Sequence, residues 1–117
     1  MELERQARRF SIVEYTYRFL SALAQQRGRG LARSAIMDLI GLTDAKALGG
    51  AFVAINNALE ELNFNPNLVY SSSGFMSNKM WSAGPQILDA IGAIQGRLHA
   101  MEPSGLMATF AKGSSVD

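Results

Sequence analysis

The hydrophobic pattern of this chain changes period once, near Leu68, and the change limits the folds that the sequence can adopt. Before Leu68, apolar residues recur at helical steps of three and four. After it, two short β-prone segments, 68–71 and 79–82, enclose a stretch rich in serine and glycine, which is typical of a hairpin. The order is therefore predicted to be several helices, one β-hairpin at about 67–82, and a further helix.

Four amphipathic stretches are predicted to be helices, and each is bounded by a recognisable stop or cap. They cover residues 10–27, 31–40, 45–62 and about 85–101. Glycines near residues 28–30 end the first, because glycine accepts the left-handed conformation that often follows a helix. Thr43 or Asp44 supplies an N-cap for the third, and Pro85 suits the first residue of the fourth.

The composition fits one globular domain. The 117 residues leave room for a single domain of ordinary size, and 48% hydrophobic with 18% charged residues is ordinary globular composition. No apolar run approaches the ~20 residues that span a bilayer, and no signal-peptide pattern opens the chain. We therefore expect a cytoplasmic protein with no membrane contact. We expect it to comprise a basic N-terminal arm at 1–9, one domain at 10–101 and a flexible Gly/Ser-containing tail at 102–117.

Two segments resemble parts of a winged helix-turn-helix DNA-binding domain. Ala35 to Thr43 is similar to the second helix and turn, where a small residue, apolar anchors and a turn glycine recur. Ala51 to Phe64 is similar to the end of a recognition helix, which closes in a leucine, acidic residues and a short break before the wing. The stretch from Gly41 to Leu62 is longer than usual, so the helix starts late or the turn is enlarged.

The resemblance implies a mainly α fold with a small β-hairpin: a winged helix-turn-helix with flanking N- and C-terminal helices. It implies a small DNA-binding protein that acts in transcription regulation or as a mobile-element accessory factor.

Positive charge is concentrated at the N-terminal end of the chain. Residues 1–33 hold seven arginines against three glutamates, a formal charge of +4, whereas residues 34–117 carry −3. A charge distribution of this kind steers polyanions such as DNA to the positive end of a protein. The alternative is that the arginines only keep an exposed N-terminal helix soluble. We expect mainly phosphate contacts rather than base reading. The candidate contacts are Arg5, Arg8, Arg9, Arg27, Arg29, Arg33, Ser34 and Lys79.

The third predicted helix offers the remaining candidate DNA contacts, Lys46, Asn56 and Asn57. An asparagine side chain is able to form two hydrogen bonds with adenine. The alternative is that both asparagines are exposed polar residues that contact only water. The outward face of this helix is nearly uncharged, which supports an alternative: a winged-helix module that binds a protein partner and no DNA.

Catalytic chemistry is not indicated by the sequence. The chain has no cysteine, and His99 has no second histidine at ligand spacing. The acidic residues and serines form no evident acid–base couple or activated nucleophile. We therefore expect no enzyme activity, no metal and no cofactor.

A homodimer through the flanking helices is expected, since Gly92 and Gly96 allow close helix approach. The alternative is that the first and last helices pack on each other within one protomer.

Overall fold

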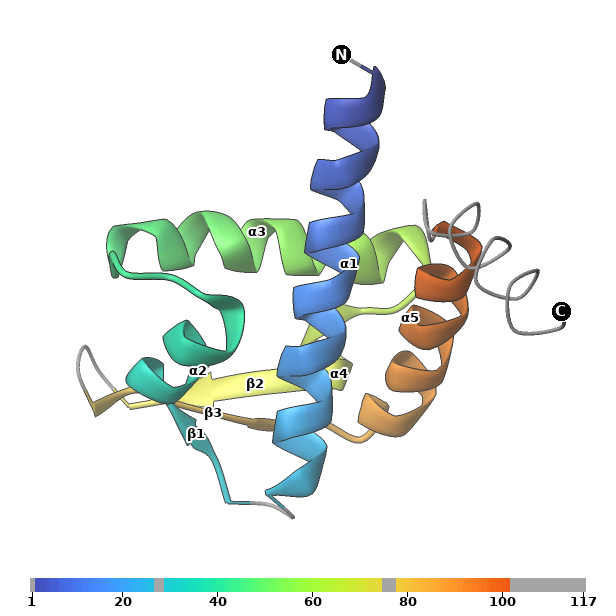
Figure 1. Ribbon diagram of the computed structural model, residues 1–117. Coiled ribbons are helices and arrows are strands. Elements are labelled where there is room, and N and C mark those ends of the chain that lie inside the picture. Colours follow the sequence, from blue (N-terminus) through green and yellow to red (C-terminus); the bar gives the residue numbers. More distant parts are fainter. Residues whose placement is uncertain (1, 27–28, 75–77, 102–117) are drawn as a thin grey trace, which may run out of the picture.

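The computed structural model of the protein describes residues 2–26, 29–74 and 78–101 (Figure 1). The chain forms, in order, α1 (Glu2–Gln25), β1 (Leu31–Ala32), α2 (Arg33–Ile40), α3 (Lys46–Glu61), α4 (Pro66–Val69), β2 (Tyr70–Ser73), β3 (Met80–Ala83) and α5 (Ile87–Met101). The described residues are therefore mainly helical with one small antiparallel sheet, as the hydrophobic pattern predicts.

The sheet has three strands in the order β1-β3-β2, so the last strand in sequence is the central one. Leu31 of β1 pairs with Trp81, and Tyr70 of β2 pairs with Ala83. The predicted strand at 68–71 was placed too early, because Leu68 and Val69 belong to α4. That short helix forms since the Asn65 side chain accepts a hydrogen bond from the Asn67 amide at 3.0 Å, directly before a proline-led first turn.

Strand β1 was not predicted, and it shortens the expected helix at 31–40. Leu31 and Ala32 pair with β3, so α2 begins only at Arg33. Gly30 makes this possible, because a Cβ atom there would lie 2.9 Å from the Trp81 carbonyl oxygen. The chain thus needs glycine where it joins the sheet.

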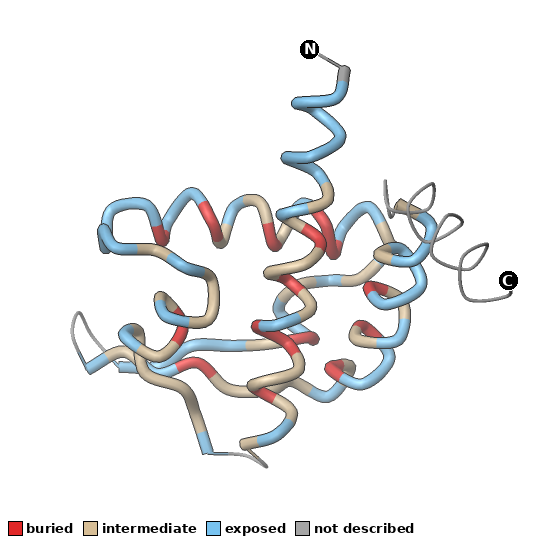
Figure 2. The backbone as a smooth tube through the Cα atoms, viewed as in Figure 1, coloured by how far each residue is buried: buried red, intermediate tan, exposed pale blue. Residues whose placement is uncertain are grey.

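Helix α1 is longer than its predicted range, since it begins at Glu2 rather than at residue 10. Its first turns project from the rest of the molecule, and residues 3–9 are exposed (Figures 1 and 2). The segment expected to be a basic arm is therefore helical from Glu2 onward. The tail at 102–117 lies outside the described residues.

The other helix boundaries lie close to their predicted positions. Gly41 ends α2 in the left-handed conformation (φ 84°), and its amide donates to the Met37 carbonyl at 2.8 Å. The Asp44 carboxylate accepts a hydrogen bond from the Lys46 amide at 2.9 Å and so fixes the turn directly before α3, whose N-cap position is Ala45. Helix α5 begins at Ile87, two residues after the predicted proline start.

The core lies where α1, α3 and α5 meet the sheet (Figure 2). Ile55, Leu59 and Trp81 are buried there, and Phe52 is half-buried. In α2 the fully buried residue is Ile36, whereas Leu39 is half-buried. The two flanking helices α1 and α5 pack on each other within the protomer.

In the part of the chain that is described, no helix combines the length and apolar character that a bilayer crossing requires.

Candidate functional site

Four aromatic side chains hold α3 against the sheet and α1. The Phe52 ring is stacked between Trp81, at 5.2 Å between centroids, and Tyr70, at 5.8 Å. Phe19 of α1 meets both Phe52 and Tyr70 edge-on, at 5.4 and 5.1 Å. Edge-on and offset-stacked pairs are favourable aromatic geometries. The cluster therefore fixes the distance between α3 and the hairpin formed by β2 and β3.

A polar contact at the edge of this cluster joins α3 to β2. The Tyr70 hydroxyl donates a hydrogen bond to the Asn56 side-chain oxygen. Burial raises the pKa of the Tyr70 phenol to about 12. The phenol is thus neutral at physiological pH, and Asn56 is held toward the hairpin.

A groove runs between α3 and the hairpin, and we term it the hairpin groove. It consists of two adjoining hollows of about 360 Å³ each, which share Gly49, Phe52, Lys79 and Trp81. One hollow continues along polar side chains of α3, β2 and the segment before it, namely Asn56, Asn67, Ser71 and Ser72. The other is lined by Arg33, at the first residue of α2. Two cations from different elements therefore line one groove beside α3.

Lys79 also covers the indole of Trp81. Its ammonium nitrogen lies 5.5 Å from the ring centroid, within the range of a cation–π contact. This contact directs the lysine along the groove wall rather than away from it.

The exposed face of α3 carries small, uncharged residues over most of its length. Gly49 and Gly50 are exposed, and no atom lies within 4 Å of the position where a Cβ would stand. Val53 is 59% exposed. Lys46 marks the N-terminal end of this face, whereas Glu60 and Glu61 are exposed at its C-terminal end. The helix therefore presents a positive start, a neutral middle and a negative end.

The two asparagines proposed as base contacts point to different sides of α3. Asn56 is half-buried in the hairpin groove. Asn57 is exposed and lines a pocket on the other side, together with residues of α1 and α5. Sequence reasoning grouped them because they are adjacent, but neighbours on a helix are about 100° apart.

The remaining predicted contacts are spread over the molecule. Arg29 and Ser34 are exposed and flank β1. Arg5 and Arg8 are exposed on the projecting turns of α1, and Arg9, the residue after Arg8, lines the pocket beside Asn57. Arg27 lies outside the described residues.

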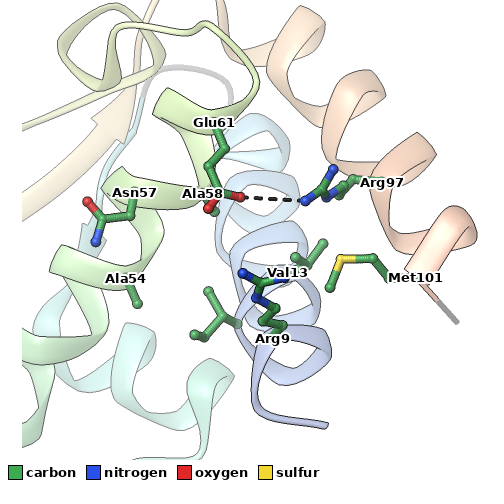
Figure 3. A pocket seen from close by; sticks show the side chains of 9 residues that line it. Arg9, Val13, Ala54, Asn57, Ala58, Glu61, Arg97 and Met101 are labelled. Atoms are coloured by element: carbon green, nitrogen blue, oxygen red, sulfur yellow. Dashed lines mark ion pairs between the residues drawn. The ribbon is translucent and has the colours of Figure 1, made fainter. Parts of the chain in front are cut away.

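That pocket, which we term the three-helix pocket, has a volume of about 200 Å³ (Figure 3). Across its mouth, Arg97 of α5 and Glu61 of α3 form an ion pair at 3.6 Å. Sequence reasoning did not single out Arg97 or this pairing. No local pattern connects two residues 36 positions apart on separate helices, so only the packing of α5 reveals them.

Within the described residues, no group of three or more histidine or acidic side chains is placed to hold a metal ion. The chain matches no protein-family model, no curated protein and no solved structure.

Proposed function

We propose that the protein is a winged-helix DNA-binding protein that places α3 in the major groove and the hairpin beside it. The observation that carries the proposal is that Arg33 and Lys79 line the same groove as the N-terminal half of α3. Cations beside a helix that enters the major groove neutralise phosphates on its flanks. We further propose that it acts in the cytoplasm, as a transcription regulator or a mobile-element accessory factor.

The order of the strands supports this arrangement. Because β1 precedes α2 and pairs with β3, the sheet ties the start of α2 to the hairpin. Arg33 therefore follows directly on a strand that pairs with the strand following Lys79. Backbone pairing thus holds the two cations close to each other.

The surface of α3 is compatible with close approach to a duplex at its N-terminal half. Gly49 and Gly50 have no side chain, so the helix backbone is able to come near a groove wall. Glu60 and Glu61 would repel phosphates, but they lie at the other end of the helix. On this proposal Asn57 is the base-reading candidate, because Asn56 is already bonded to Tyr70.

A homodimer through α5 is part of the proposal. Gly92 and Gly96 are exposed with no atom near their Cβ positions, and Leu88, on the same helix face, is 72% exposed. An apolar side chain beside two glycines suits close packing against a second helix. Two copies related by a two-fold axis would then present two α3 helices to adjacent half-sites.

One observation favours protein binding as the second candidate. From residue 47 to residue 59, α3 carries no charged residue, and its exposed middle includes Val53. A neutral face of this kind suits a protein partner as well as a DNA groove.

Fluorescence anisotropy with a labelled duplex, over a series of salt concentrations, separates the two candidates. Each phosphate contact adds about −0.9 to the slope of log affinity against log salt. The double variant Arg33→Gln/Lys79→Gln should therefore flatten the slope by about two units. Arg97→Gln is the control, because it removes a positive charge from α5, outside the groove.

Asn57→Ala should instead alter the preference among duplex sequences by roughly 1–3 kcal/mol if Asn57 reads a base. A parent protein that is folded yet binds no duplex even at low salt would reject DNA binding. That result would favour the second candidate function, a module that binds a protein partner.

A further inference from the structure

The three-helix pocket combines two arginines with an apolar floor, and neither feature belongs to the hairpin groove. The floor is built by Val13 of α1, by Ala54 and Ala58 of α3, and by Met101 of α5 (Figure 3). The guanidinium groups come from Arg9 and Arg97, which lie on different helices. The pocket also lies on the opposite side of α3 from the hairpin groove, since Ala54 and Ala58 are about half a helical turn away from Phe52 and Asn56.

The charges at the mouth of the pocket are only partly balanced. Arg97 and Glu61 are 3.6 Å apart, longer than the roughly 2.7–2.9 Å of a charge-assisted hydrogen bond, and their side chains are 42% and 62% exposed. Arg9 forms no ion pair or side-chain hydrogen bond with any other described residue. Two cations therefore face one loosely held carboxylate, and the site retains a net positive charge.

The size and lining of the pocket define what it would accept. Its volume of about 200 Å³ is below the roughly 300 Å³ at which drug-sized ligands begin to fit. The small side chains Ala54 and Ala58 leave room above α3 for a compact apolar group. Guanidinium groups bind carboxylates through paired, parallel N–H donors. Inorganic phosphate would use the arginines but gain nothing from the apolar floor.

We propose that the three-helix pocket binds a small organic acid, with its carboxylate at Arg97 and Arg9 and its apolar body against Val13, Ala54 and Ala58. The incoming carboxylate displaces Glu61 from Arg97. This site is separate from the hairpin groove, because none of its residues lines that groove. It adjoins the proposed DNA-binding surface only at Asn57, which lines the pocket as well.

The test is a titration of the full chain with benzoate, followed by two-dimensional amide NMR at low ionic strength and without DNA. We expect saturable shifts at Val13, Ala54, Ala58 and Arg97, with a dissociation constant on the order of millimolar for so small a ligand. Benzamide, benzylamine and inorganic phosphate are matched probes that lack the charge, reverse it, or lack the apolar body. Benzamide and benzylamine should bind at least about tenfold more weakly than benzoate, because hydrogen bonds between charged partners are stronger than neutral ones. Inorganic phosphate should also bind more weakly, because it buries no apolar surface against the floor.

Variants locate the binding site. Arg97→Gln should weaken benzoate binding about tenfold or more, and Ala54→Leu should abolish it by filling the cavity. Glu61→Gln should strengthen it, because the competing carboxylate is gone. Arg5→Gln is the charge-matched control, one turn before Arg9 and outside the pocket, and it should change the affinity less than about twofold because exposed charges are screened.

The amide spectrum of each variant also reports whether the variant is folded. The proposal is overturned if benzamide binds as well as benzoate, or if Arg97→Gln binds as the parent does. It is also overturned if the shifts map to the hairpin groove.

Discussion

Replacing Phe19 tests whether the aromatic cluster is the structural centre of this fold. Phe19 is fully buried on α1 and meets the rings of Phe52 and Tyr70 edge-on. Those two rings come from α3 and β2, so a single side chain joins three elements. Removing this side chain should therefore lower the stability of the whole domain rather than of one helix.

The expected magnitude follows from burial and ring contacts. Phe19→Ala should lower the free energy of unfolding by about 3–5 kcal/mol, the usual cost of deleting a buried phenylalanine. Phe19→Leu keeps most of the apolar volume but loses two edge-on contacts, each worth about 0.5–1.5 kcal/mol, so it should cost about 1–3 kcal/mol. Phe52→Ala should cost less than Phe19→Ala, because Phe52 is only half-buried beside the groove.

Urea denaturation followed by fluorescence measures all three variants. Trp81 is the only tryptophan in the sequence and stacks on Phe52, so its emission reports on the cluster directly. Circular dichroism provides a second probe, and the two should give coincident transitions for a two-state domain. A loss below about 1 kcal/mol for Phe19→Ala would refute the argument that this ring joins α1 to α3 and the sheet.

Four further substitutions have expected outcomes. Gly49→Ala and Gly50→Ala should each stabilise the protein by about 0.5–1 kcal/mol in urea denaturation, because both lie in a helix with open space at the Cβ position; a loss of stability would mean that the space is filled. Gly84→Ala should lower the melting temperature, since its Cβ would come within 2.8 Å of backbone atoms of Leu68, and an unchanged value would disprove that close approach. The pKa of Tyr70 is about 12 in the folded protein and about 10 in the unfolded chain. The neutral phenol therefore makes its full contribution to the free energy of unfolding below pH 10, and this contribution is lost as the pH rises toward 12. Tyr70→Phe should remove that part of the alkaline stability loss, which urea denaturation at pH 9 and pH 11 will detect.

The candidate site was only partly predictable from sequence. Arg33 and Lys79 were predicted to be phosphate contacts, and the structure places both in one groove. Their proximity depends on β1, which was read as part of a helix because two residues carry no periodic signal. Phe52 and Tyr70 were not proposed as groove residues, since an aromatic residue in an apolar stripe looks the same whether it is buried or half-exposed.

Local chemistry determined where most of the elements lie. The helical stripe of α3 and the glycine stop at Gly41 depend on residues within a few positions of one another, and the sequence indicated both. The N-cap of α3 was expected at Thr43 or Asp44, but it is Ala45, with Asp44 bonded to the Lys46 amide beside it. The hairpin was expected for the same reason, although α4 displaced its first strand by two residues.

Tertiary structure alone decided which residues share a surface. The pairing of Leu31 with Trp81 spans fifty residues, and the contact of Arg97 with Glu61 joins two helices separated by the hairpin. Asn56 and Asn57 are adjacent in sequence yet lie on different sides of α3, one bonded to Tyr70 and the other beside the three-helix pocket. Periodicity along the chain shows that a helix has a buried face, but the partner of each remaining face is set by packing between distant segments, whose contact energies no local pattern records.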